Sequence, residues 1–94
     1  LSAYPNPASI SGGAAKVHYL LLGDSDVKIQ LFDCNGDLVW EKSCVSGGAG
    51  GKRGVNDVLW NLRNGSGRAV ETGVYTCVVK SGSVKKTSRI GIKK

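Results

Sequence analysis

The chain is short of the residue types on which most enzyme sites depend. It has one histidine, one phenylalanine and no methionine among its 94 residues. The histidine, His18, is expected to face solvent on an alternating strand, with no carboxylate to orient it and no nucleophile elbow, which argues against Ser–His or Cys–His catalysis. Zinc sites need closely spaced pairs of cysteine or histidine, whereas Cys34, Cys44 and Cys77 are scattered singly. We therefore expect no enzyme activity, metal, cofactor or small-molecule ligand.

Long apolar runs and helical periodicity are also missing. The longest apolar stretch near the N-terminus, 17–22, is interrupted by His18 and is far shorter than the roughly 20 residues that span a bilayer. No window of about ten residues keeps a helical period. Fourteen glycines against two prolines, with hydrophobic residues at 40%, indicate a folded chain with many tight turns. We expect residues 1–94 to form one all-β domain without a membrane span.

Apolar and polar residues alternate in several segments, as they do in strands that bury one face. The segments are 16–22, 27–31, 38–42, 55–60, 73–80 and 84–92. The residues expected to point inward are Val17, Tyr19, Leu21, Val27, Ile29, Leu31, Val58, Trp60, Tyr75, Cys77 and Val79. With an extended or turn segment at Tyr4–Pro7, the pattern predicts an immunoglobulin-like (fibronectin III-like) antiparallel β-sandwich of about seven strands.

Turn residues and cysteines constrain the hairpin in the first half of the chain. Asn35-Gly36 predicts a two-residue type I′ turn, in which Cys34 faces Asp37 and Cys44 lies opposite Val27. A bridge between the two cysteines would need a slipped ladder, so we expect none. Since three cysteines cannot all pair within one molecule, at least one thiol is free or bonds externally, and Cys77 is expected to be a small buried hydrophobe.

Two acidic clusters invite a calcium interpretation. Asp33-x-Asn35-x-Asp37 copies the opening of a calcium loop, but Leu38 replaces the required glycine and Cys44 stands where a glutamate should close it. Asp24-x-Asp26 either helps to hold calcium or caps the bend between two strands, and we favour capping. Residues 45–54, VSGGAGGKRG, predict an irregular, mobile loop without the pattern of a phosphate loop.

Positive charge is concentrated at the C-terminal end. Thirteen Lys and Arg against seven Asp and Glu give a formal charge of +6. No acidic residue follows Glu71, and the basic residues after it are Lys80, Lys85, Lys86, Arg89, Lys93 and Lys94. Lysines that protect an edge strand from aggregation explain this end better than a nucleic-acid surface does. Nucleic-acid binding also needs exposed aromatic residues, and none follows Tyr75, so no nucleic-acid partner is expected.

The two tryptophans have different interpretations. Trp60, like Tyr75, is interpreted as a core residue, with the Tyr75 hydroxyl bonded to backbone. Trp40 alternates with Val39, so one of the two should face outward. We favour the core for Trp40. An outward Trp40 would form, with the 45–54 loop, a platform that stacks on sugar rings.

The order of these motifs resembles a known family. The matching segments are Tyr4-Pro5-Asn6-Pro7, Val17-x-Tyr19-x-Leu21, Val27-x-Ile29-x-Leu31-Phe32-Asp33-x-x-Gly36-x-Leu38-Val39, Gly54-x-Asn56-x-x-x-Trp60-Asn61 and Gly67-Arg68-x-Val70-x-x-Gly73-Val74-Tyr75. They resemble the immunoglobulin-like domain of flagellar hook-capping proteins (FlgD-like) and are similar to the related C-terminal sorting domains of type IX secretion substrates. The resemblance spans nearly the whole chain.

The resemblance implies a non-catalytic C-terminal module of a larger secreted or cell-surface bacterial protein, which acts in sorting, anchoring or assembly through protein contacts. The start at Leu1 without a methionine is what a processed product or a piece of a longer chain would show. Under this hypothesis Arg89, Lys93 and Lys94 contact secretion or assembly machinery. The alternative is a carbohydrate-binding accessory module of a secreted hydrolase, with Trp40 as its glycan platform. A flagellar hook-capping assembly domain is the third hypothesis.

Overall fold

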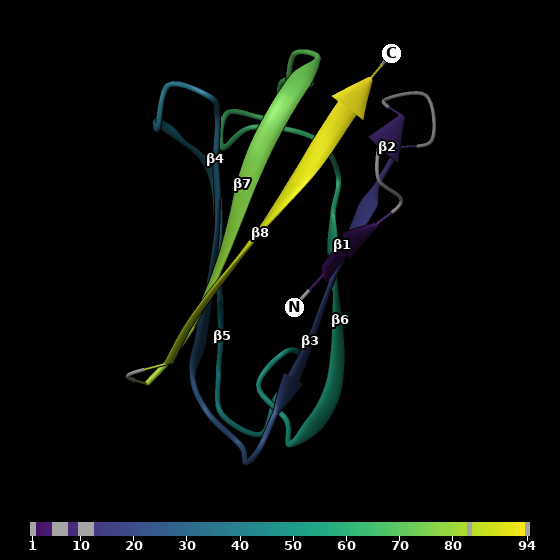
Figure 1. Cartoon of the computed structure of the whole chain (residues 1–94). Coiled ribbons are helices and arrows are strands. Elements are labelled where there is room, and N and C mark those ends of the chain that lie inside the picture. Colours follow the sequence, from purple (N-terminus) through teal and green to yellow (C-terminus); the bar gives the residue numbers. More distant parts are fainter. Residues whose placement is uncertain (1, 5–7, 10–12, 83, 94) are drawn as a thin grey trace.

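The protein is a β-sandwich. The computed structural model describes residues 2–4, 8–9, 13–82 and 84–93, and these contain strands, turns and loops but no helix (Figure 1). The strands are β1 (Ser2–Tyr4), β2 (Ala8–Ser9), β3 (Ala15–Leu21), β4 (Val27–Phe32), β5 (Leu38–Cys44), β6 (Gly54–Trp60), β7 (Gly73–Ser81) and β8 (Val84–Lys93). The predicted fold class is confirmed, and the six alternating segments coincide with β3 to β8 to within two residues. No helix that could cross a membrane occurs in the described part of the chain.

The strands form a three-stranded sheet in the order β1-β3-β6 and a five-stranded sheet in the order β2-β8-β7-β4-β5. Their pairings are antiparallel except for the short parallel pairing of β2 with β8, which the sequence did not predict. The N-terminal segment therefore contributes one short strand to each sheet. Residues 5–7 of the predicted extended or turn segment lie outside the described residues.

Side chains from the inner faces of both sheets make the core. Every residue predicted to point inward has an exposed fraction of 7% or less. Trp60 lies at the centre of an aromatic cluster, with its ring centroid 5.9 Å from Tyr75 and 6.2 Å from Trp40. Its indole Nε1 donates a hydrogen bond to the Arg63 carbonyl at 3.0 Å, so the polar atom of this buried side chain is satisfied. The core placement of Trp60 and Tyr75 is confirmed.

The crossover from β6 to β7 is fixed by a tyrosine corner. The Tyr75 hydroxyl donates a hydrogen bond to the Glu71 carbonyl at 2.7 Å, four residues upstream, as in immunoglobulin-like domains. This confirms the expected bond of Tyr75 to backbone. Within the crossover, the Asn64 carboxamide oxygen accepts the N–H groups of Ser66 and Arg68. The segment is thus held by its own backbone and side chains rather than by regular pairing.

The turn between β4 and β5 differs from the prediction. A type I′ turn needs positive φ at both central residues, but Gly36 has φ 84° and Asn35 has no positive φ. Asp33 pairs with Asp37 through an N–H···O bond of 3.0 Å, and the Gly36 N–H donates to the Asp33 carbonyl at 3.1 Å. These bonds describe a type I turn followed by a left-handed glycine. Cys34 therefore does not face Asp37, although Cys44 lies opposite Val27 as expected.

The register of β5 shifts by one residue beside this turn. Leu31 pairs with Trp40 and Phe32 pairs with Leu38, which leaves Val39 as the extra residue of a bulge. Both Val39 and Trp40 are half-buried and pack against the core. The expectation that one of them faces outward is wrong, because a bulge interrupts the alternation on which it depended.

The glycine-rich loop between β5 and β6, expected to be irregular and mobile, is held by hydrogen bonds at three points. Asp24 Oδ1 accepts the Arg53 N–H and Asp26 Oδ1 accepts the Ser46 N–H, each at 2.8 Å. The Tyr19 hydroxyl donates to the Gly50 carbonyl at 2.6 Å. The expected capping by Asp24 and Asp26 is therefore confirmed. They cap a loop that is distant in sequence, which the local pattern did not reveal.

Candidate functional site

Exposed apolar side chains lie on the outer face of the three-stranded sheet. Leu20 and Val55 are paired across β3 and β6, each with 64% of its surface exposed. Leu59, the last outward residue of β6, is 61% exposed. Leu20 and Val55 are therefore adjacent, whereas Leu59 lies about 13 Å further along β6, opposite Lys16 and beyond the row of His18 and Asp57. Exposed apolar side chains that share one face of a sheet commonly mark a contact surface. We call Leu20, Val55 and Leu59 the apolar face. Sequence reasoning placed Leu20 outward but missed the cluster, because the cluster depends on the pairing of β3 with β6.

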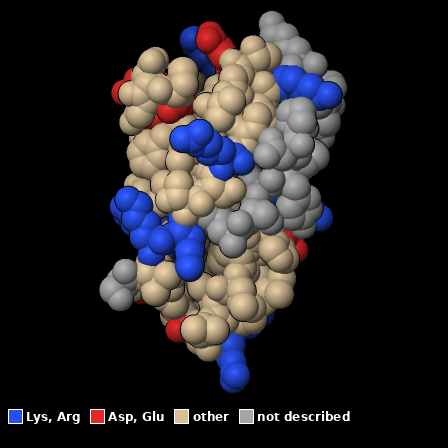
Figure 2. All heavy atoms as spheres, in the orientation of Figure 1, with Lys and Arg blue, Asp and Glu red and all other residues tan. Residues whose placement is uncertain are grey.

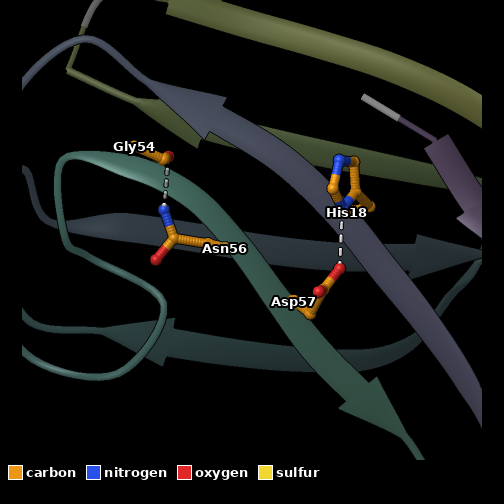
Figure 3. A network of polar contacts seen from close by, with 4 residues as sticks. All are labelled: His18, Gly54, Asn56 and Asp57. Atoms are coloured by element: carbon orange, nitrogen blue, oxygen red, sulfur yellow. Dashed lines mark hydrogen bonds and ion pairs between the residues drawn. The ribbon is translucent and has the colours of Figure 1, made fainter.

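A histidine–aspartate pair lies within this face (Figure 3). His18 Nδ1 is 2.7 Å from Asp57 Oδ1, and the two side chains are 40% and 43% exposed. The prediction that His18 has no carboxylate beside it is wrong, since the register of β3 and β6 brings together residues 39 positions apart. The neighbouring Asn56 points away from this pair and donates to the Gly54 carbonyl at 3.1 Å. Exposed on a sheet and outside the two hollows described below, His18 and Asp57 form a hydrogen-bonded pair on the surface.

The predicted partner contacts lie on the other sheet. Arg89 and Lys93 are both exposed on β8, on the face opposite the buried Ile90 and Ile92. They are four residues apart, or about 13 Å along the strand, so the structure does not bring them together. Arg89 lies opposite Thr76 and lines a shallow hollow of about 550 Å³ with Phe32, Cys34 and other residues. Lys94 lies outside the described residues.

A wider groove runs beside Trp40. It has a volume of about 880 Å³ and is lined by the tip of the β4–β5 hairpin and by the crossover, including Asn64, Arg68 and Glu71. Trp40 supplies part of its wall while packing on Trp60. The predicted platform of Trp40 with the 45–54 loop is wrong, because that loop follows the other end of β5 and none of its residues lines the groove.

In the part of the chain that is described, the cysteine and acidic side chains do not gather into a metal-binding group. Cys34, Cys44 and Cys77 are unbridged, with Cys34 exposed and the other two buried. Burial raises the pKa of the Cys77 thiol to about 11, which keeps it protonated and unreactive. Asp33 uses one carboxylate oxygen to accept the N–H groups of Asn35 and Asp37. No group of three or more His, Cys, Asp or Glu side chains within the described ranges could hold a metal ion.

Comparison with known proteins finds the same fold in parts of longer bacterial proteins. No family model and no curated protein matches the sequence. PorZ, an essential bacterial surface component of the type IX secretion system of Porphyromonas gingivalis, is similar over 99% of this chain, with 23% identity and a TM-score of 0.73. Dimeric latent PorU from P. gingivalis is similar over 98%, with 20% identity and a TM-score of 0.67.

FlgD from Pseudomonas aeruginosa is similar over 92% of this chain, with 18% identity and a TM-score of 0.65. The chain spans 11% of PorZ, 9% of PorU and 66% of FlgD. At these identities the likeness is one of fold. The predicted resemblance to FlgD-like and type IX secretion domains is confirmed at that level.

Proposed function

We propose that this protein is a non-catalytic module of a secreted or cell-surface bacterial protein, and that it acts in sorting, anchoring or assembly through protein contacts. The observation that carries this proposal is the apolar face, where Leu20, Val55 and Leu59 are each more than 60% exposed. Burying these side chains against a partner is favourable, whereas leaving them in water serves neither the core nor solubility.

The fold neighbours support the same function. A type IX surface component, PorU and FlgD carry domains of this shape within longer chains. Residues 1–94 are accordingly proposed to be one domain of a larger exported protein. Arg89, Lys93 and Lys94 remain the proposed contacts at the basic end, and strand addition to a sheet edge is the proposed mode of pairing. Such pairing takes its affinity from backbone hydrogen bonds and its selectivity from side chains.

A reporter fusion tests the proposal. The 94 residues are placed after a secreted reporter in a bacterium that has a type IX system and in a strain that lacks it. We expect the reporter outside the first strain only. The double variant Leu20→Ser/Leu59→Ser should lower export by about fivefold, because a combined loss of about 1 kcal/mol from the two contacts weakens binding by that factor.

Val84→Ser is the matched control, since Val84 is exposed at the start of β8, on the other sheet. Equal export from both strains, or a folded fusion that stays inside both, would contradict a sorting role. Equal loss in the control and the double variant would remove the apolar face from the proposal.

Glycan binding is a second candidate because Trp40 lines a groove with the polar residues Asn64, Arg68 and Glu71. Aromatic rings with a few converging polar groups suit a sugar. A glycan pull-down with the wild type and Trp40→Phe tests it: binding that falls with the smaller ring supports this candidate, and no binding by either protein excludes it for the glycans tried. The hook-capping hypothesis would be supported by restored hook assembly in a strain whose FlgD carries this domain in place of its own.

A further inference from the structure

Three lysines from three neighbouring strands lie side by side on the outer face of the five-stranded sheet. Lys28 on β4 pairs in register with Lys80 on β7, and Lys80 pairs with Lys85 on β8. Val27, Ile29 and Val79 beside them are buried, so this row points to solvent. Figure 2 shows Lys and Arg side chains gathered over this end of β7 and β8. We call Lys28, Lys80 and Lys85 the lysine row.

The protein neutralises little of this charge. Glu41 on β5 is the carboxylate nearest the row, with its Oε1 3.4 Å from Lys28 Nζ. A hydrogen bond from Gln30, and then the charges of Lys28 and Lys80, hold the pKa of Glu41 below its usual range. No other ion pair reaches the row among the residues that the structure describes. Because like charges directly opposite in a sheet repel, the row is unfavourable in the free domain.

The rest of this face extends the positive charge and adds one half-buried aromatic ring, that of Phe32. From Lys85 the outward positions of β8 continue through Thr87 and Arg89 to Lys93. The cations are four residues apart, or about 13 Å in a strand. Thr87, Val78 and Gln30 occupy the row between Lys80 and Arg89. Single-stranded nucleic acid stacks on several exposed aromatic rings, whereas this face offers one half-buried ring, Phe32, in the hollow beside Arg89.

We propose that the outer face of the five-stranded sheet binds an acidic, extended polypeptide segment laid along β8, with carboxylates at the lysine row. In an extended segment, acidic residues four positions apart repeat at about the same 13 Å as the cations of β8. Charge complementarity would then offset the repulsion within the row and speed association. This inference rests on the proposed function, because it names the chemistry of the protein partner.

Fluorescence polarisation with a labelled deca-glutamate peptide tests the proposal. We expect binding that weakens about fivefold or more as NaCl is raised from roughly 20 to 200 mM, since the Debye length falls from about 20 Å to about 7 Å. Lys28→Ala/Lys80→Ala should weaken it about tenfold. Lys16→Ala/Lys52→Ala is the control, because it removes the same charge from the other sheet and from the glycine-rich loop. It should change the affinity for the peptide less than twofold.

The outcomes separate specific from general attraction. Equal weakening by both double variants would overturn the proposal, as would tighter binding of a labelled deca-uridylate, which offers phosphates instead of carboxylates. Absence of deca-glutamate binding would also overturn it. Amide chemical-shift changes confined to β4, β7 and β8 would support it. None of these results depends on export, so the inference can fail while the proposed function stands.

Discussion

The lysine row predicts that a charge reversal on the surface stabilises the protein. Lys80 is the middle residue, with Lys28 on one side and Lys85 on the other. Lys80→Glu replaces two repulsive neighbours with two attractive ones. The substitution changes the strand propensity little, because lysine and glutamate are both modestly disfavoured in strands.

The expected gain follows from the spacing of the charges. Side chains directly opposite start about 5 Å apart, so ammonium and carboxylate groups at their flexible ends lie about 7 Å apart. Two unit charges at about 7 Å in water interact by about 0.6 kcal/mol, and salt at about 0.1 M reduces this to about 0.3 kcal/mol. Two repulsions lost and two attractions gained give about 1.2 kcal/mol. Since Glu41 loses the favourable charge of Lys80, we expect about 1 kcal/mol or slightly less.

Thermal and urea unfolding at several salt concentrations measure this gain. About 1 kcal/mol raises the Tm of a domain of this size by about 4 to 8 °C. The gain should grow at about 10 mM salt and nearly vanish at about 1 M, where the Debye length is about 3 Å. Lys16→Glu is the control, because it changes net charge equally but lies opposite Leu59. A gain that is independent of salt, or equal in the control, would refute the electrostatic reasoning.

Three further predictions concern the core and the loops. Burial raises the pKa of the Cys77 thiol to about 11 from 9.0, so the native state keeps a proton that the unfolded chain loses. The free energy of unfolding should therefore fall by up to about 2 to 3 kcal/mol as pH rises from about 9 to 11. Urea unfolding at several pH values should show that this free energy depends less on pH in Cys77→Ala. Gly51→Ala should destabilise the protein by more than about 2 kcal/mol, because the added Cβ would clash with two backbone carbonyls. Gly23→Ala is the control, since its Cβ would meet nothing within 4 Å. Similar Tm values for the two variants would refute the packing of the loop. Tyr19→Phe should cost about 1 kcal/mol and speed hydrogen exchange in residues 46–53, and unchanged exchange would show that the hydroxyl does not anchor the loop.

Much of the fold could be predicted from the sequence, because the strands alternate cleanly. Val17, Tyr19 and Leu21 repeat at a period of two, and so do Ile29 and Leu31, so their burial follows from local pattern. The turn at Asn35 was mispredicted because the Asp33 carboxylate accepts two backbone N–H groups and favours a wider turn than Asn-Gly alone indicates.

Features that depend on pairing between distant strands were not predictable from local pattern. His18 meets Asp57, and Lys28 meets Lys80, only once the register of each sheet is fixed. The apolar face likewise depends on the register of β3 and β6, which places Leu20 opposite Val55. The bulge at Val39 breaks the alternation that would have turned either Val39 or Trp40 outward. Both side chains therefore pack against the core. Functional surfaces of a sandwich are therefore less visible in sequence than its core.

Photo-crosslinking in living cells identifies which surfaces of the protein contact a partner. A photoreactive amino acid is placed at Leu59, on the apolar face, at Thr87, beside the lysine row, and at Arg68, in the groove beside Trp40. In a bacterium with a type IX system, we expect discrete protein crosslinks from Leu59 and Thr87, and fewer from Arg68. Crosslinks to protein from Arg68 alone, or from none of the three positions in a folded and exported fusion, would contradict a module that works through the outer faces of its sheets.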